Sequence, residues 1–235
     1  MEKPRIALLN AAFSKANTRR NFRRELAADL TEFDVTGGHV PESYDGFDGV
    51  VVTGSRASVY WDEPWIDAAR VSVRDAVDAG LPVLGVCWGH QLLADALGGR
   101  VEDMGEFEIG YRTVRRTDGD DAGLFDGIDR EFTAFTTHGD EVVELPPGAV
   151  ELAANDYSVQ AFRTGHAFGV QFHPEYDTET AREVTLGKEF LDDDRIESVL
   201  DGITEENYEA ACRTKALFDN FVEYVRAHGP EVAAD

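Results

Sequence analysis

The feature that most constrains this fold is the regular alternation of short apolar runs and helical patterns through the first hundred residues. The runs are apolar at every position rather than at every second one, which is typical of parallel strands buried on both faces. Expected strands are 6–10, 33–36, 49–53 and 82–86, and expected helices are 18–30, 64–80 and 88–97. Pro64 suits the first turn of a helix, and Gly80 and Gly98 suit helix ends.

The second half of the chain has a different pattern, with strands joined by turns and then helices. Expected strands are 107–115, 131–137, 150–154, 158–163 and 167–172, and two expected helices, 178–187 and 204–228, close the chain. The sequence therefore predicts an α/β fold, a mostly parallel open sheet flanked by helices with an antiparallel portion. We expect a single domain over 1–235, with a core at about 1–188 and a helical extension at 189–235. Ligands of such sheets bind beyond the carboxyl ends of the strands.

The charge of the chain restricts its partners. With 46 acidic and 22 basic side chains the formal net charge is −24, which opposes binding to nucleic acid or to anionic membranes. We interpret the acidic residues as a solvated coat suited to high salt, a halophilic trait. No apolar run approaches the roughly 20 residues of a membrane span, and no signal peptide opens the chain. We therefore expect a cytoplasmic protein whose two cysteines, Cys87 and Cys212, are free thiols.

Cys87 lies in a Gly-x-Cys-x-Gly pattern between an expected strand and an expected helix. This is the thiol form of the nucleophile elbow, a sharp turn that exposes its central residue above the sheet. Gly85 and Gly89 fit such a turn because a β-carbon at either position would obstruct the close backbone approach. A helix N-terminus also favours a thiolate and offers N–H groups to an oxyanion. We predict that Cys87 is a nucleophile and that Cys212, in a plain helical pattern, serves packing.

A thiol nucleophile needs a base, and His173 is the best placed of the six histidines. It ends an expected strand and is followed by Pro174 and Glu175. Residues i and i+2 of a strand share a face, so Glu175 can orient the imidazole while its other nitrogen faces the thiol. These residues predict a Cys-His-Glu triad.

Taken together, Cys87-Trp-Gly-His-Gln91 and His173-Pro174-Glu175 resemble the class I (triad) glutamine amidotransferases. The segment from His138 to Val142, and Glu108 near Gly110, resemble the GMP-synthase-type branch. The resemblance implies that Cys87 attacks the side-chain amide of glutamine, that His173 transfers the proton to ammonia, and that Glu175 orients His173. It implies that Gly54 and the amide of Trp88 bind the oxyanion, and that Gln91, Ser55 and His138 lie near the substrate.

Several functions fit this site. No phosphate-binding loop for ATP and no metal-spaced cluster is visible, so we expect no cofactor and no metal. One hypothesis is release of ammonia for a separate synthase subunit. A second is a stand-alone hydrolase of γ-glutamyl peptides or amines, because Thr53-Gly54-Ser55 replaces the family's usual Gly-Gly-Pro. A third is a non-catalytic regulatory subunit, which the complete triad argues against.

Three further segments carry expectations. The aromatic stretch 60–65 either lines the site or anchors a helix start. The arginines between Arg19 and Arg24 form either an exposed face balanced by acids or a docking patch for an anionic partner. We expect Asp192-Asp193-Asp194 to be a solvated loop rather than a metal site.

Overall fold

The computed structural model describes residues 2–229, which form one nine-stranded sheet with helices on both faces. The strands are β1 (Arg5–Asn10), β2 (Asp29–Asp34), β3 (Gly49–Val52), β4 (Val83–Val86), β5 (Arg100–Arg116), β6 (Glu131–Glu144), β7 (Val150–Ala154), β8 (Val159–Thr164) and β9 (Ala167–Val170). The helices are α1 (Lys15–Glu25), α2 (Pro64–Asp78), α3 (Trp88–Ala96), α4 (Thr178–Leu186), α5 (Asp193–Gly202), α6 (Glu205–Cys212) and α7 (Ala216–His228). Within residues 2–229, no helix is long and apolar enough to cross a membrane.

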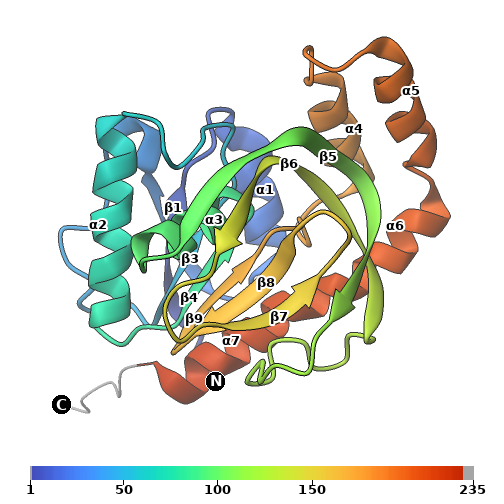
Figure 1. Ribbon diagram of the computed structural model, residues 1–235. Coiled ribbons are helices and arrows are strands. Elements are labelled where there is room, and N and C mark those ends of the chain that lie inside the picture. The colour runs from blue at the N-terminus through green and yellow to red at the C-terminus, as the bar shows by residue number, and fades with distance from the viewer. Residues whose placement is uncertain (1, 230–235) are drawn as a thin grey trace.

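The sheet order confirms the expected architecture. The order is β2-β1-β3-β4-β9-β8-β7-β5-β6, in which the first five strands are parallel and the rest are antiparallel. In Figure 1 the long β5–β6 hairpin arches over the antiparallel half. The runs in β1, β3 and β4 are apolar at every position because both of their faces are buried.

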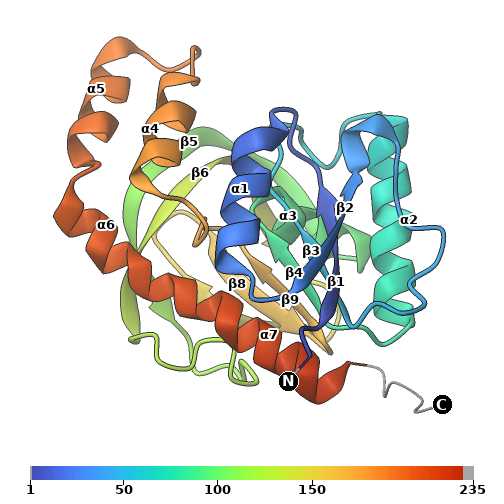
Figure 2. The same cartoon turned by 180° about the vertical axis from the view of Figure 1, so that it is seen from behind.

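Helices cover the two faces of the parallel strands separately. Ile6 and Leu8 of β1 belong to an apolar cluster with Phe22 of α1 and Phe218 of α7. Ala7 and Leu9 point the other way, into a cluster with α2 and α3. Figure 2 shows α1 and α7 side by side over one face. The large side chains of α7 thus belong to the main core, although α7 lies within the expected extension.

Three expectations about secondary structure are wrong. The first helix ends at Glu25 rather than at position 30, and Leu30 belongs to β2, where it pairs with Ile6. Residues 35–36, expected as the end of a strand, belong to a 3-10 turn at Val35–Gly37. The expected helix 204–228 is divided into α6 and α7 by a 3-10 turn at Arg213–Lys215. Pairing along β1 outweighs the local helical preference of residues 26–30.

The acidic run at 192–194 is also not a loop. It starts α5, a helix that the sequence analysis did not predict. The side chain of Asp192 accepts a hydrogen bond of 2.7 Å from the backbone N–H of Arg195, and Asp193 and Asp194 occupy the first turn. Carboxylates at a helix N-terminus satisfy free N–H groups and interact favourably with the helix dipole.

Candidate active site

Cys87 lies in the sharp turn between β4 and α3. Its backbone has φ 54° and ψ −107°, a conformation that L-residues rarely adopt, and the residue is 5% exposed. The glycines on either side permit the turn. A β-carbon on Gly85 would lie 2.2 Å from the carbonyl oxygen of Gly89, and one on Gly89 would lie 2.4 Å from that of Val52. The turn therefore needs both glycines, as the elbow pattern predicts.

His173 and Glu175 follow β9 at the same edge of the sheet. Nδ1 of His173 lies 2.8 Å from Oε1 of Glu175, and both side chains are buried. Burial lowers the pKa of His173, but the charges of Glu175 and Cys87 outweigh it and raise this pKa to about 10. The ring also stacks on Tyr176 at 4.1 Å between centroids. The imidazole is thus held on one side by Glu175, and the neighbouring negative charges favour its protonated form.

Gly54 brings a third loop to Cys87. A β-carbon built on Gly54 would lie 3.9 Å from Sγ of Cys87 and 3.2 Å from Cε1 of His173. Trp88 begins α3 directly after Cys87, where the N–H groups of a first helical turn have no partner within the helix. Gly54 and Trp88 therefore both adjoin Cys87, while their donation to an oxyanion stays a prediction.

The predicted substrate-binding residues Ser55, Gln91 and His138 line one cavity beside Cys87, of about 380 Å³. The Gln91 amide donates to the carbonyl of Asp140 and to Oε1 of Gln171, both at 3.0 Å. Nε2 of His138 lies 2.7 Å from the buried carboxylate of Glu108. These bonds fix strand β6 at the cavity wall, while contact with a substrate stays a prediction.

A second cavity, of about 110 Å³, lies on another side of Cys87. Its walls include Asn17 and Asn21 of α1 and Glu183 of α4, together with His173. No residue of 60–65 is among the described residues that line either cavity. Instead Trp65 packs on Trp88 with 5.4 Å between ring centroids, so this stretch anchors a helix start. Cys212 lies outside both linings.

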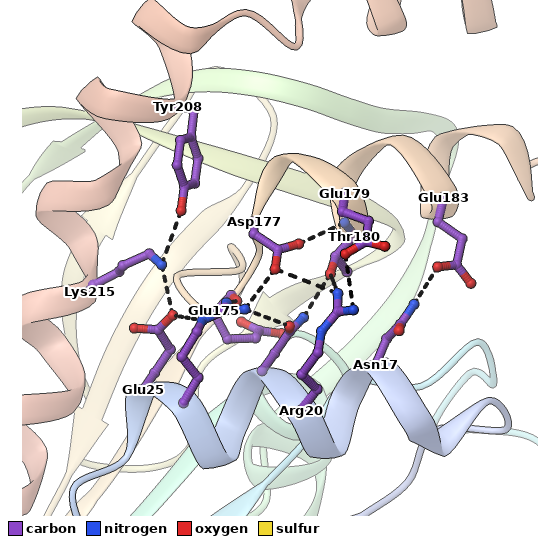
Figure 3. A network of polar contacts seen from close by, with 12 residues as sticks. Asn17, Arg20, Glu25, Glu175, Asp177, Glu179, Thr180, Glu183, Tyr208 and Lys215 are labelled. Atoms are coloured by element: carbon purple, nitrogen blue, oxygen red, sulfur yellow. Dashed lines mark hydrogen bonds and ion pairs between the residues drawn. The ribbon is translucent and has the colours of Figure 1, made fainter.

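The arginines of α1 mostly face carboxylates. Arg19 pairs with Glu32, and Arg20 pairs with Asp177 and Glu179. Figure 3 shows Arg20 of α1 facing Asp177, Glu179 and Thr180 at the start of α4. The structure thus favours the balanced-face interpretation over a docking patch.

Arg24 connects this helix to the predicted triad. Its Nη2 donates a 2.7 Å hydrogen bond to the backbone carbonyl of Glu175, and its Nη1 lies 2.6 Å from the carboxylate of Asp177. Asp177 in turn accepts a hydrogen bond from the N–H of Thr180 and caps α4. Helix α1 therefore fixes the chain directly after His173.

Sequence reasoning missed two cations at the site. Arg56 and Lys188 line both cavities. The loop after β3 carries Arg56, and Lys188 follows α4. The one available signal is that Lys188 is among only four lysines in the chain.

Comparisons with known proteins agree with this geometry. The sequence model of the family "Glutamine amidotransferase class-I" matches residues 10–192. A GMP synthase (glutamine-hydrolyzing) of Thermus thermophilus is 36% identical over 177 residues, covering 72% of this chain but only 33% of that protein. Gamma-glutamyl peptidase 5 of Arabidopsis thaliana is 34% identical over 160 residues, covering 65% of this chain and 64% of that one.

Among solved structures, a glutamine amidotransferase from Thermotoga maritima has the same fold. Its TM-score is 0.77 at 23% identity, and the match covers 95% of this chain and all of that one. The family match over most of the chain agrees with the resemblance based on Cys87 and His173. The chain belongs to the class I glutamine amidotransferase family.

Proposed function

We propose that this protein hydrolyses the γ-amide of glutamine through a γ-glutamyl thioester on Cys87. The observation that carries the proposal is that three segments meet at the sulfur of Cys87. They are the strained turn that carries Cys87 itself, the loop with Gly54, and the segment with the buried His173–Glu175 pair. The raised pKa of His173 favours an imidazolium next to a thiolate, which is the reactive form of a thiol nucleophile.

In this reaction the Cys87 thiolate attacks the amide carbon, and the carbonyl electron pair moves to oxygen. The amides of Gly54 and Trp88 donate to that oxyanion. The imidazolium of His173 gives its proton to the amide nitrogen as the carbon–nitrogen bond breaks, and ammonia leaves. Water, deprotonated by His173, then attacks the thioester, which releases glutamate and restores the thiolate. Glu175 stabilises the imidazolium in both halves.

The partner would be a separate synthase subunit that consumes the ammonia. The support is the likeness of this chain to a protein named GMP synthase (glutamine-hydrolyzing), of which the match covers 33%. The reaction itself involves no metal or cofactor, and the acidic surface gives no support for a nucleic-acid or membrane partner. We also infer from the same surface a cytoplasm of high salt.

A second candidate is hydrolysis of γ-glutamyl peptides or amines by the same residues. The cavity that includes Asn17, Asn21 and Glu183 favours it, because departing ammonia needs no such space. The likeness to a protein named gamma-glutamyl peptidase 5 points the same way.

The deciding experiment measures glutamate release from L-glutamine in high KCl, with the γ-glutamyl adduct sought by intact mass. Cys87→Ser is the test variant, and Cys212→Ser is the matched control because it removes the other thiol. Turnover or an adduct in wild type and Cys212→Ser, but not in Cys87→Ser, supports the proposal. Equal turnover in all three proteins would reject Cys87 as the nucleophile. γ-Glutamyl amines that are cleaved faster than glutamine would favour the second candidate.

A further inference from the structure

Arg56 and Lys188 stand out because they lie where the two cavities meet. Both cavities share Ser55, Arg56, Cys87, Thr137 and Lys188 in their walls. A substrate whose amide carbon is at Cys87 extends its glutamyl part to one side and its leaving group to the other. The two cations therefore border the space that both parts of such a substrate would occupy.

Neither cation has a carboxylate partner among residues 2–229, although the chain carries 46 acidic side chains. The charges that act on Lys188 are those of Cys87 and Arg56, and no carboxylate contributes. Its Nζ lies 4.7 Å from the centroid of the Phe107 ring. A terminal nitrogen of Arg56 would lie 3.2 Å from a β-carbon on Gly187, which places the guanidinium beside the segment that carries Lys188.

This arrangement is unfavourable without a ligand. Burial and, to a smaller extent, the charge of Arg56 lower the pKa of Lys188 to about 8, despite the opposing effect of Cys87. Most arginines of α1 pair with acidic side chains, as described above. In so acidic a chain, the lack of such a partner within residues 2–229 for Arg56 and Lys188 is therefore unusual. Two neighbouring cations without an acid form a site that an anion would complete.

We propose that Arg56 and Lys188 form a carboxylate-binding site that selects substrates carrying a carboxylate close to the scissile γ-amide. The guanidinium suits a planar carboxylate because its N–H groups form a fork, and the ammonium adds a point charge. The carboxylate belongs either to the α-carbon of the glutamyl part or to an amino acid as leaving group. The inference rests on the proposed function, since it deepens the specificity of the same site.

The experiment compares kcat/KM of wild type, Arg56→Gln and Lys188→Gln. The substrates are γ-glutamylglycine, its C-terminal amide, L-glutamine and the α-amide of glutamine. Arg23→Gln is the control, because Arg23 is exposed, lies outside both cavities and has no ion-pair partner among residues 2–229. Loss of a charged hydrogen bond typically lowers affinity about 10- to 100-fold, and we expect this loss in KM rather than in kcat.

The substrates separate the two sources of the carboxylate. A leaving-group carboxylate predicts that the variants lose activity on γ-glutamylglycine and keep it on the C-terminal amide. An α-carboxylate predicts equal losses on both and on L-glutamine, with none on the α-amide of glutamine. The proposal is overturned if both variants behave as Arg23→Gln does on every substrate, or if kcat falls equally whether or not a carboxylate is present.

Binding separates this inference from the proposed function. Calorimetry of γ-glutamylglycine with Cys87→Ser, and with Cys87→Ser combined with Lys188→Gln, needs no turnover. A wild type that cleaves nothing refutes the hydrolase, while a Kd that rises at least tenfold in the double variant still supports the carboxylate site. Equal Kd values in the two proteins overturn it.

Discussion

The contact between Arg24 and the chain after His173 allows a quantitative test. Replacing Arg24 with Met removes the 2.7 Å hydrogen bond to the Glu175 carbonyl and the ion pairs with Asp177 and Glu25. The bond from a charged donor is worth about 1.5 kcal/mol at the low end of its range. The Arg24 side chain is 36% exposed, so each ion pair contributes only about 0.5 kcal/mol. The sum is about 2.5 kcal/mol.

For a domain of this size, that loss lowers Tm by roughly 5–10 °C. We expect kcat for glutamine to fall by up to about tenfold, since up to about 1.4 kcal/mol of positioning is lost. KM should stay unchanged, because Arg24 lines neither cavity. Thermal unfolding and initial rates of glutamate release measure both effects.

Arg23→Met is the matched control, one position away and without an ion-pair partner among residues 2–229. It should leave Tm and kcat close to wild type. Arg24→Lys, which keeps a charge but not the fork, should fall between them. If Arg24→Met equals Arg23→Met in both measurements, α1 does not position Glu175 and the reasoning is wrong.

Three other predictions follow from the same structure. Gly89→Ala should destabilise the fold by at least about 2 kcal/mol, because the added β-carbon meets the Val52 carbonyl. Gly54→Ala should leave Tm unchanged but lower kcat, because its β-carbon crowds His173. Equal Tm values for the two variants would contradict this difference. The pKa of Lys188 is about 8 in the fold and higher in the unfolded chain, so its charge costs stability fully below pH 8, and this cost disappears as pH rises toward 10.5. Lys188→Met should therefore raise the free energy of unfolding at pH 7 by at most about 3 kcal/mol, and with it Tm. If thermal unfolding scans show that this gain in Tm does not shrink toward pH 10, the buried charge of Lys188 is not its cause. Tm of the wild type should rise with KCl from low salt upward, since screening reduces repulsion among 46 acidic side chains, and a steady fall would exclude the high-salt interpretation.

The sequence predicted the parts of the fold that local pattern determines. The apolar runs of β1, β3 and β4 and the paired glycines around Cys87 carry their own signal, since each requirement is met within a few residues. Only the last two residues of the strand at Asp29–Asp34 fell within the strand expected at 33–36. The rest was not predicted because its residues are mostly polar, and its pairing with β1 comes from tertiary structure.

The cations of the site escaped prediction for a similar reason. Arg56 and Lys188 are 132 residues apart, and nothing in either neighbourhood indicates that the two segments meet above Cys87. Arg24 was noticed only as part of a basic cluster, because its bond to a backbone carbonyl leaves no trace in the sequence.

The backbone of Cys87 also bears on how such a chain can evolve. A non-glycine residue at φ 54° and ψ −107° stores about 1–3 kcal/mol of strain, which glycine at the same position would relieve. Selection for stability alone would thus replace the side chain that we propose as the nucleophile. A descendant that kept only a regulatory role would gain stability from that replacement. If Cys87 is the nucleophile, its retention at this strained position means that the chain keeps a less stable backbone for the sake of its activity.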